Sequence, residues 1–228
     1  MHWIATLVVL LLWPAVAGAQ EWQDHIFRQD GFSINFPGQP RITETKWQSQ
    51  LDYVLPARVY SATKGAERYT ATVVDFTPLE EQGVARWKAC PTGNAQCRDG
   101  GETIGKGYWK QDERGAMAYA VAKYMKDPQY TISDYAWEWQ DMVEGYSLRL
   151  LSKDKRRVLV YVAQHNRKLY ILEASAPEST FEPGLFQQSM GYLDENGNKV
   201  RYTETIYSGS YHGLGVYPRP KYRVNGPE

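Results

Sequence analysis

The pattern in this chain that is best suited to binding chemistry is the aromatic run Tyr135-Ala136-Trp137-Glu138-Trp139. Side chains alternate between the two faces of a β-strand, so a strand here would place the three rings on one face. Such a face could stack on sugar rings or be covered by a partner, because aromatic rings offer large apolar areas. Aromatic residues also favour the interior of a sheet, and sheet core is the interpretation that we favour.

Two loop-like segments partly match ligand-binding motifs. The segment from Gly100 to Lys106 has the spacing of a phosphate-binding loop, but Gly107 follows where Ser or Thr would bind magnesium. Residues 194–205 begin like a calcium loop, but Lys199 and Thr205 replace the glycine and glutamate that the loop requires. We interpret both segments as turns, and we predict no cofactor.

Residues for catalysis or metal binding are sparse. The histidines after the first few residues are His25, His165 and His212, whose spacing does not match a zinc motif, and we interpret them as surface or turn residues. The sequence contains no G-x-S-x-G motif, and no S-x-x-K accompanied by S-D-N or K-T-G. We therefore predict neither a catalytic residue nor a metal ligand, and we expect a protein that is not an enzyme.

The N-terminus predicts an address outside the cytoplasm. Residues 3–17 are almost wholly apolar and are followed by Ala17-Gly18-Ala19, the pattern of a signal-peptide cleavage site. The run is shorter than the roughly 20 residues of a membrane-spanning helix. We expect residues 1–19 to be a signal peptide cleaved after Ala19. The remaining chain would then be periplasmic or secreted and would not span the membrane.

The two cysteines fit that address. Cys90 and Cys97 enclose a short turn-forming segment. In an oxidising compartment we expect them to form a disulfide that stabilises the fold by about 2–3 kcal/mol. The alternative is a redox pair, but redox sites favour C-x-x-C spacing.

Composition and charge limit the kinds of partner and the number of domains that this chain can have. The 228 residues include 26 Lys and Arg and 26 Asp and Glu, so the formal net charge is zero. This balance argues against nucleic acid as a partner, because phosphate contacts need a basic excess. Residues 20–207 suffice for one domain. Residues 208–228 are rich in Gly, Pro and Tyr, which predicts a loose tail or, alternatively, a recognition arm anchored by Tyr211 and Tyr217.

The elements that would position these residues are mostly strands. Alternating and β-branched runs predict strands, and capping and periodicity predict helices. Expected strands cover 32–36, 41–50, 57–63, 68–76, 130–139, 146–151, 157–164, 168–176 and 199–207. Expected helices cover 78–88, 113–126 and 182–192, and a strand is the alternative for 113–126, where Tyr119, Val121 and Tyr124 alternate. Short turns make the strands from 146 to 176 an antiparallel meander. The order predicts an α+β fold, with an antiparallel β-sheet flanked by helices.

The segment Gly31–Pro40, GFSINFPGQP, resembles the opening strand of secreted bacterial proteins of the PsbP-like superfamily. Leu169–Ala174 and Phe186–Ser189 are similar to its later strand and helix, and the likeness covers residues 26–192 in element order. The overall likeness is to uncharacterised proteobacterial envelope proteins of this kind. This resemblance implies an α/β/α sandwich and a binding or assembly factor, and it carries over no functional residue.

These observations predict a binding or assembly module that contacts another cell-envelope component, a protein or a glycan. The expected contact residues are Tyr135, Trp137, Trp139, Tyr211 and Tyr217. The alternatives are an envelope hydrolase, or a protein that binds a small ligand or a glycan through the aromatic strand face.

Overall fold

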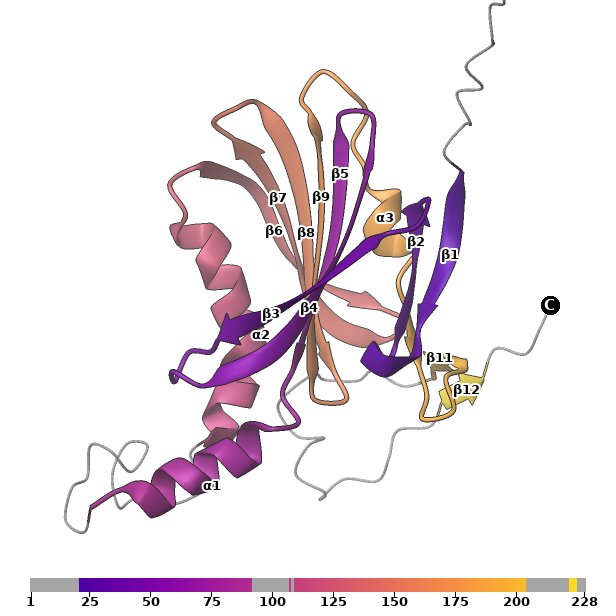
Figure 1. The fold of residues 1–228 in the computed structure, drawn as a ribbon. Helices are drawn as coiled ribbons and strands as arrows, with labels where there is room; N and C mark the ends of the chain where they lie inside the picture. The colour runs from indigo at the N-terminus through magenta and orange to yellow at the C-terminus, as the bar shows by residue number, and fades with distance from the viewer. Residues whose placement is uncertain (1–20, 92–106, 108, 204–221, 225–228) are drawn as a thin grey trace, which may run out of the picture.

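The computed structural model describes residues 21–91, 107, 109–203 and 222–224. Its largest element is a seven-stranded antiparallel sheet (Figure 1). The strands in spatial order are β3 (Arg41–Gln48), β4 (Val54–Lys64), β5 (Glu67–Asp75), β9 (Lys168–Pro177), β8 (Arg156–His165), β7 (Val143–Ser152) and β6 (Tyr130–Gln140). The expected strands over 57–63 and 68–76 pair as β4 and β5, the predicted meander is confirmed, and β3 and β6 form the two edges of this sheet in the described residues.

Tight turns join the strands of the meander. Asp141 and Met142 connect β6 to β7, and Asn166 and Arg167 connect β8 to β9. All four residues have positive φ, as two-residue turns with the twist of a β-hairpin require. The first turn therefore lies between the expected strands 130–139 and 146–151, and β7 begins at Val143, before the expected Tyr146.

A smaller antiparallel sheet packs beside the large one. Its strands in order are β1 (Trp22–Phe27), β2 (Phe32–Pro37), β10 (Gly191–Leu193), β11 (Lys199–Tyr202) and β12 (Tyr222–Val224), and the 3-10 helix η1 (Arg28–Asp30) joins β1 to β2. β12 belongs to the segment that the sequence sets apart as a tail, so part of that segment pairs with β11.

The helix expected over 182–192 is wrong over most of its length. Only α3 (Leu185–Gln188) is helical. After it, Gly191 and Tyr192 pair with Ser33 and Phe32 of β2. The Asn35 backbone N–H donates to Ser189 Oγ at 3.0 Å. Backbone pairing with β2 thus replaces the helical hydrogen bonds that this segment could make locally.

The other two helices are confirmed. They are α1 (Leu79–Ala89) and α2 (Trp109–Lys126). α2 begins four residues before the expected Glu113, so Asp112 lies inside its first turn. Asp112 Oδ1 accepts a hydrogen bond from the Leu51 N–H at 3.0 Å, which ties α2 to the β3–β4 connection.

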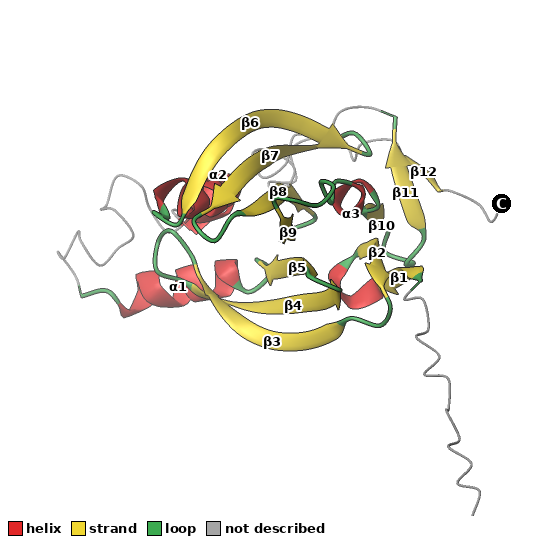
Figure 2. Cartoon of the chain, turned by 90° about the horizontal axis from the view of Figure 1, so that it is seen from above, coloured by secondary structure: helices red, strands yellow, loops and turns green. Residues whose placement is uncertain are grey.

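The large sheet is the central layer. α1 and α2 cover one of its faces, and the small sheet with α3 covers the other (Figure 2). The α+β class is therefore confirmed, and the layer opposite α1 and α2 combines a short helix with a second sheet. None of the helices in the described residues is long and apolar enough to cross a membrane.

Each face of the central sheet has its own core. The core between the two sheets is aromatic and includes Phe32, Phe36, Tyr170, Phe186 and Tyr192. The core beneath the helices includes Ala116, Ala120 and Val121 of α2, together with Leu148, Val160 and Val162 of the sheet. Alanines let α2 approach the sheet closely. Burial on both faces explains why β8 reads as a nearly continuous apolar run.

The interpretation of His165 as a surface or turn residue is wrong. Its side chain is buried, and its Nε2 forms a hydrogen bond with the Tyr202 hydroxyl. His165 ends β8, directly before the turn, but the small sheet covers that end of the strand. His25 lies on β1, where Nε2 contacts the Gly38 carbonyl oxygen at 3.0 Å.

Several predictions concern residues outside the described part of the chain. These are the signal peptide at 1–19, Cys97, His212, Tyr211 and Tyr217. Cys90 lies directly after the end of α1. The disulfide that would join Cys90 to Cys97 and the address outside the cytoplasm therefore stay predictions.

Candidate functional site

The aromatic run lies on β6, which is an edge of the central sheet. Tyr135, Trp137 and Trp139 are 46%, 50% and 43% exposed. The interpretation of these rings as sheet core is therefore wrong. The strand and the shared face are as predicted, but the sheet ends at β6. Figure 2 shows β6 at the outer margin of the sheet, with β7 on its inner side.

The rings lie on the face of the sheet that α1 and α2 cover. Tyr135 is paired with Leu148, a member of the core beneath the helices, and Trp137 is paired with Tyr146, which packs against that core. Neighbours across an antiparallel pair share a face. We call Tyr135, Trp137, Trp139 and Tyr146 the aromatic stripe. It continues the apolar core outward to solvent.

Contacts within the aromatic stripe hold the rings in place. Trp137 and Trp139 lie 4.5 Å apart between ring centroids, with their planes tilted by 42°. Tyr135 stacks on Tyr146 at 5.6 Å. The Trp137 indole N–H donates to Glu144 Oε1 at 3.0 Å. Partial burial, with Tyr146 nearby, raises the pKa of Tyr135 above the ordinary tyrosine value. The rings thus contact one another while those of Tyr135, Trp137 and Trp139 remain close to half exposed.

The opposite face of β6 is acidic and polar. Asp134 and Glu138 are exposed there. Arg149 of β7 lies 4.0 Å from Asp134 and 3.6 Å from Glu182, measured from Nε to a carboxylate oxygen. The Gln140 amide donates to the carbonyl oxygens of Gln187 and Met190 at 2.6 and 2.8 Å. These two bonds fasten the end of β6 to the segment around α3.

The other edge of the sheet is different in character. β3 carries the charged residues Arg41, Glu44 and Lys46 among threonines, and almost all of its residues are exposed. Charged side chains are a common protection of an exposed edge against pairing with other strands. β6 instead presents large rings along its edge, and exposed apolar area of this kind commonly marks an interaction surface.

Tyr146 and Glu144 are members of this site that sequence reasoning missed. The expected strand over 146–151 begins at Tyr146, so it leaves Glu144 outside the strand and does not show that Tyr146 faces Trp137. The two-residue turn at Asp141 and Met142 instead brings Glu144 beside Trp139 and Tyr146 beside Trp137. A signal was present in Gly145, because its backbone packs against the Tyr161 ring and leaves no room for a side chain.

Buried ionisable groups elsewhere have structural partners. Asp30 lies between the sheets, where its carboxylate accepts from Arg58 Nη1 at 2.6 Å and from the Tyr60 hydroxyl. Lys168 Nζ lies 3.6 Å from the same carboxylate. Burial, followed by the Asp30 contact, raises the pKa of Tyr60. The Tyr170 hydroxyl donates to the Asp30 carbonyl oxygen at 2.8 Å, so this cluster fastens η1 to the central sheet.

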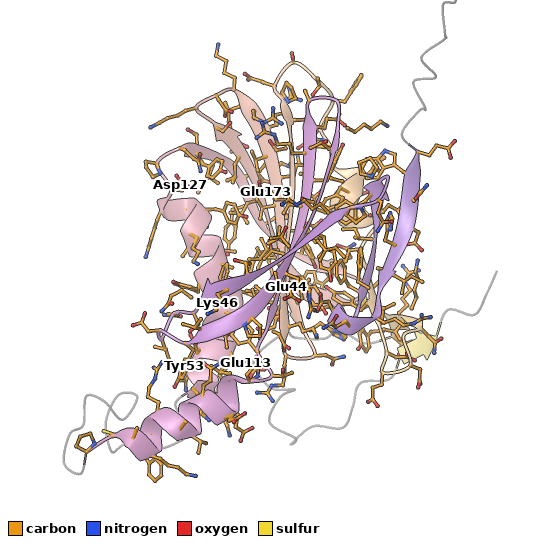
Figure 3. The ribbon with its side chains drawn as sticks, viewed as in Figure 1. Glu44, Lys46, Tyr53, Glu113, Asp127 and Glu173 are labelled. Carbon is orange, nitrogen blue, oxygen red and sulfur yellow. The ribbon has the colours of Figure 1, made fainter. Side chains whose placement is uncertain are left out.

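Two glutamates with raised pKa values lie in different parts of the molecule. Glu113 is near the contact of α1 with α2, and Glu173 is farther up the central sheet (Figure 3). They do not form the close carboxylate pair of a retaining glycosidase. No group of three His, Cys, Asp or Glu in the described residues could hold a metal ion. A hollow of about 380 Å³ is lined, among the described residues, by Lys155, Pro177, Glu178 and Ser179, none of which is a histidine or cysteine.

Comparison with known proteins yields a likeness of fold. No family model matches the sequence, and no curated protein matches it. Among solved structures, the solution structure of cyanobacterial PsbP (CyanoP) from Synechocystis sp. PCC 6803 is similar, with a TM-score of 0.43 and 15% identity. The match covers 80% of this chain and 99% of that chain. This likeness concerns the fold alone, and no residue role follows from it.

Proposed function

We propose that this protein is a non-catalytic binding module of the cell envelope and that the aromatic stripe is its binding surface. The observation that supports the proposal is the exposure of Tyr135, Trp137 and Trp139, each close to half exposed, on an edge strand. Tyr and Trp are the residue types that contribute most to binding energy at interfaces. The contacts among the rings already restrict their rotation, so less side-chain entropy is lost when a partner binds.

A location outside the cytoplasm is part of the same proposal. A chain cleaved after Ala19 would meet its partner outside the cytoplasm, so the partner is an envelope protein or an envelope glycan. A glycan is the second candidate, because Trp137 and Trp139 could each stack on a sugar ring. The 42° tilt between their planes favours a protein partner, since the two rings do not form one flat platform for a saccharide chain.

Crosslinked capture from the native envelope tests the proposal. The bait is the tagged chain from Gln20 onward, compared with a double variant Trp137→Ser, Trp139→Ser. Loss of two interface tryptophans should reduce capture of the specific partner about tenfold or more. The matched control is Ile42→Ser, which removes an apolar side chain of 49% exposure from the other edge strand.

The control variant should capture the partner as well as the wild type does. All three proteins should melt at similar temperatures, because the substituted side chains are half exposed. If the double variant is folded and captures the same partner in the same yield, the aromatic stripe is not the binding surface. If the wild type retains only labelled envelope oligosaccharide, and the double variant releases it, the glycan takes the place of the protein partner.

A further inference from the structure

We infer that the partner supplies an extended peptide segment that pairs with β6 as an added strand, with apolar side chains at alternate positions and Lys or Arg between them. This inference rests on the proposed function and specifies the partner of the same surface. Three features at β6 support it: the backbone edge that faces away from β7, the aromatic stripe on one face, and the acidic side chains on the other face.

The backbone of β6 is available for such pairing. In the described part of the chain β6 pairs only with β7, and the register is regular from Asp134 to Gln140 after a bulge near Ile132. Every second residue of an edge strand directs its N–H and C=O away from the existing neighbour. The regular run has about the length of an ordinary strand, so one extended segment could pair along all of it.

The side chains on one face of β6 favour an apolar counterpart. An added strand would place every second side chain beside Tyr135, Trp137 and Trp139, as cross-strand neighbours do. These contacts would extend the core that ends at Leu148 and Tyr146. Main-chain hydrogen bonds then supply affinity, and the alternate side chains supply specificity.

The side chains on the other face favour a basic counterpart. Asp134 and Glu138 are exposed on that face. The neighbouring cation, Arg149, is shared between Asp134 and Glu182. A second copy of this chain would bring two such acidic faces together, and like charges across a strand pair are destabilising. Charge therefore favours a basic segment of another protein over a β6–β6 dimer.

Selection from displayed random peptides tests the inference. The chain from Gln20 to Glu228 is the target, and the peptides are linear and long enough to cover β6. Peptides retained by the wild type and by Ile42→Ser, but not by Trp137→Ser, Trp139→Ser, are expected to alternate apolar residues with Lys or Arg. The best peptide is then N-methylated at every second residue, in either of the two phases.

An added strand predicts a difference between the two phases. Methyl groups on the N–H groups that face β6 should weaken binding about tenfold or more, whereas methyl groups that face away should leave it nearly unchanged. Amide hydrogen exchange of alternate β6 residues should also slow when the peptide binds. These two results together would support strand addition.

Three other results would overturn it. If both methylation phases bind equally, the peptide contacts side chains only, and the proposed binding surface stands without strand pairing. If no selected peptide depends on Trp137 and Trp139, the partner is not an extended peptide, and envelope capture alone then decides the proposed function. If the wild type forms a dimer in sedimentation that the double variant does not, β6 is occupied by a second copy.

Discussion

At the scale of single residues, the contact of Glu173 with Tyr124 is a partly buried ionisable pair beneath a helix. Glu173 belongs to β9, and Tyr124 belongs to α2. The Tyr124 hydroxyl donates to Glu173 Oε2 at 3.0 Å. Burial raises the pKa of Glu173, and the Tyr124 hydrogen bond opposes the rise without cancelling it. Burial, together with the Glu173 charge, raises the pKa of Tyr124.

Glu173 should make the protein less stable as the pH rises. Its folded pKa lies above the unfolded value near 4.5, so the folded state holds more protons between the two pKa values. The free energy of unfolding therefore falls as the pH rises through that window. Glu173→Gln should remove this contribution, and its unfolding free energy should decrease less than that of the wild type across the same window.

Urea unfolding at a series of pH values measures the effect. Glu178→Gln is the control, because Glu178 is exposed just after β9. The control should follow the wild type at every pH. Glu113 and Asp112 also have raised pKa values from burial, so the comparison uses the difference between variant and wild type. Equal pH dependence in Glu173→Gln and wild type would contradict the assignment.

The sequence predicts the shared face of Tyr135, Trp137 and Trp139 because a strand has a fixed period. It does not predict their exposure, which depends on β6 being the last strand of the sheet. Nothing within the strand specifies its neighbours, and pairing is a property of the whole fold. The local pattern thus predicts which rings share a face, whereas the tertiary structure determines their exposure. The residues whose exposure the sequence does not predict are those of the candidate site.

At the scale of elements, the contact of α1 with α2 depends on a glycine. A methyl group at Gly83 of α1 would lie 2.5 Å from Trp109 Cδ1 of α2, so the tryptophan ring packs directly on the helix backbone. Glycine in a helix interior costs about 1 kcal/mol relative to alanine. The close approach of Trp109 explains why glycine occupies the position despite that cost.

Gly83→Ala should therefore destabilise the protein by about 1–3 kcal/mol, because relief of the overlap must move Trp109. The matched control is Gly115→Ala in α2, where the added methyl group would meet Gln50 Oε1 at 2.7 Å. The flexible end of Gln50 can move away, so the control should be neutral or more stable by up to about 1 kcal/mol. Urea unfolding of both variants measures the change in the free energy of unfolding, and we expect changes of opposite sign. Two stabilised variants would show that α1 does not pack on α2 through Gly83.

Elements with strong local signals are those that the sequence predicts. The alternation in β5 and the turns of the meander specify the central sheet, and the alanines of α2 favour a helix. β1 was missed because most of its residues are exposed and it shows little alternation. β10 was misread as helix because its conformation comes from pairing with β2. Both belong to the small sheet, where β1 pairs with the neighbouring β2 and β10 pairs with β2 across a long separation in sequence.

At the scale of the whole molecule, the two cores share one central sheet, and α1 and α2 close one of its faces. Cys90 directly follows α1. The helix α2 begins at Trp109, whose ring packs on Gly83 of α1. The chain between them therefore leaves and rejoins the same helical layer. A disulfide from Cys90 to Cys97 would restrict the first part of that connection and would reduce the entropy of the unfolded chain.

The exported protein should begin at Gln20 and should be lighter by two hydrogens than its reduced form, and intact-mass spectrometry tests both expectations.

Reduction should lower the melting temperature by about 4–12 °C, from a stabilisation of about 2–3 kcal/mol in a domain of this size. The control is the double variant Cys90→Ser, Cys97→Ser, whose melting temperature should be lower and insensitive to reductant. Two free thiols in the exported protein would exclude the disulfide. An N-terminus at Met1 would exclude cleavage after Ala19.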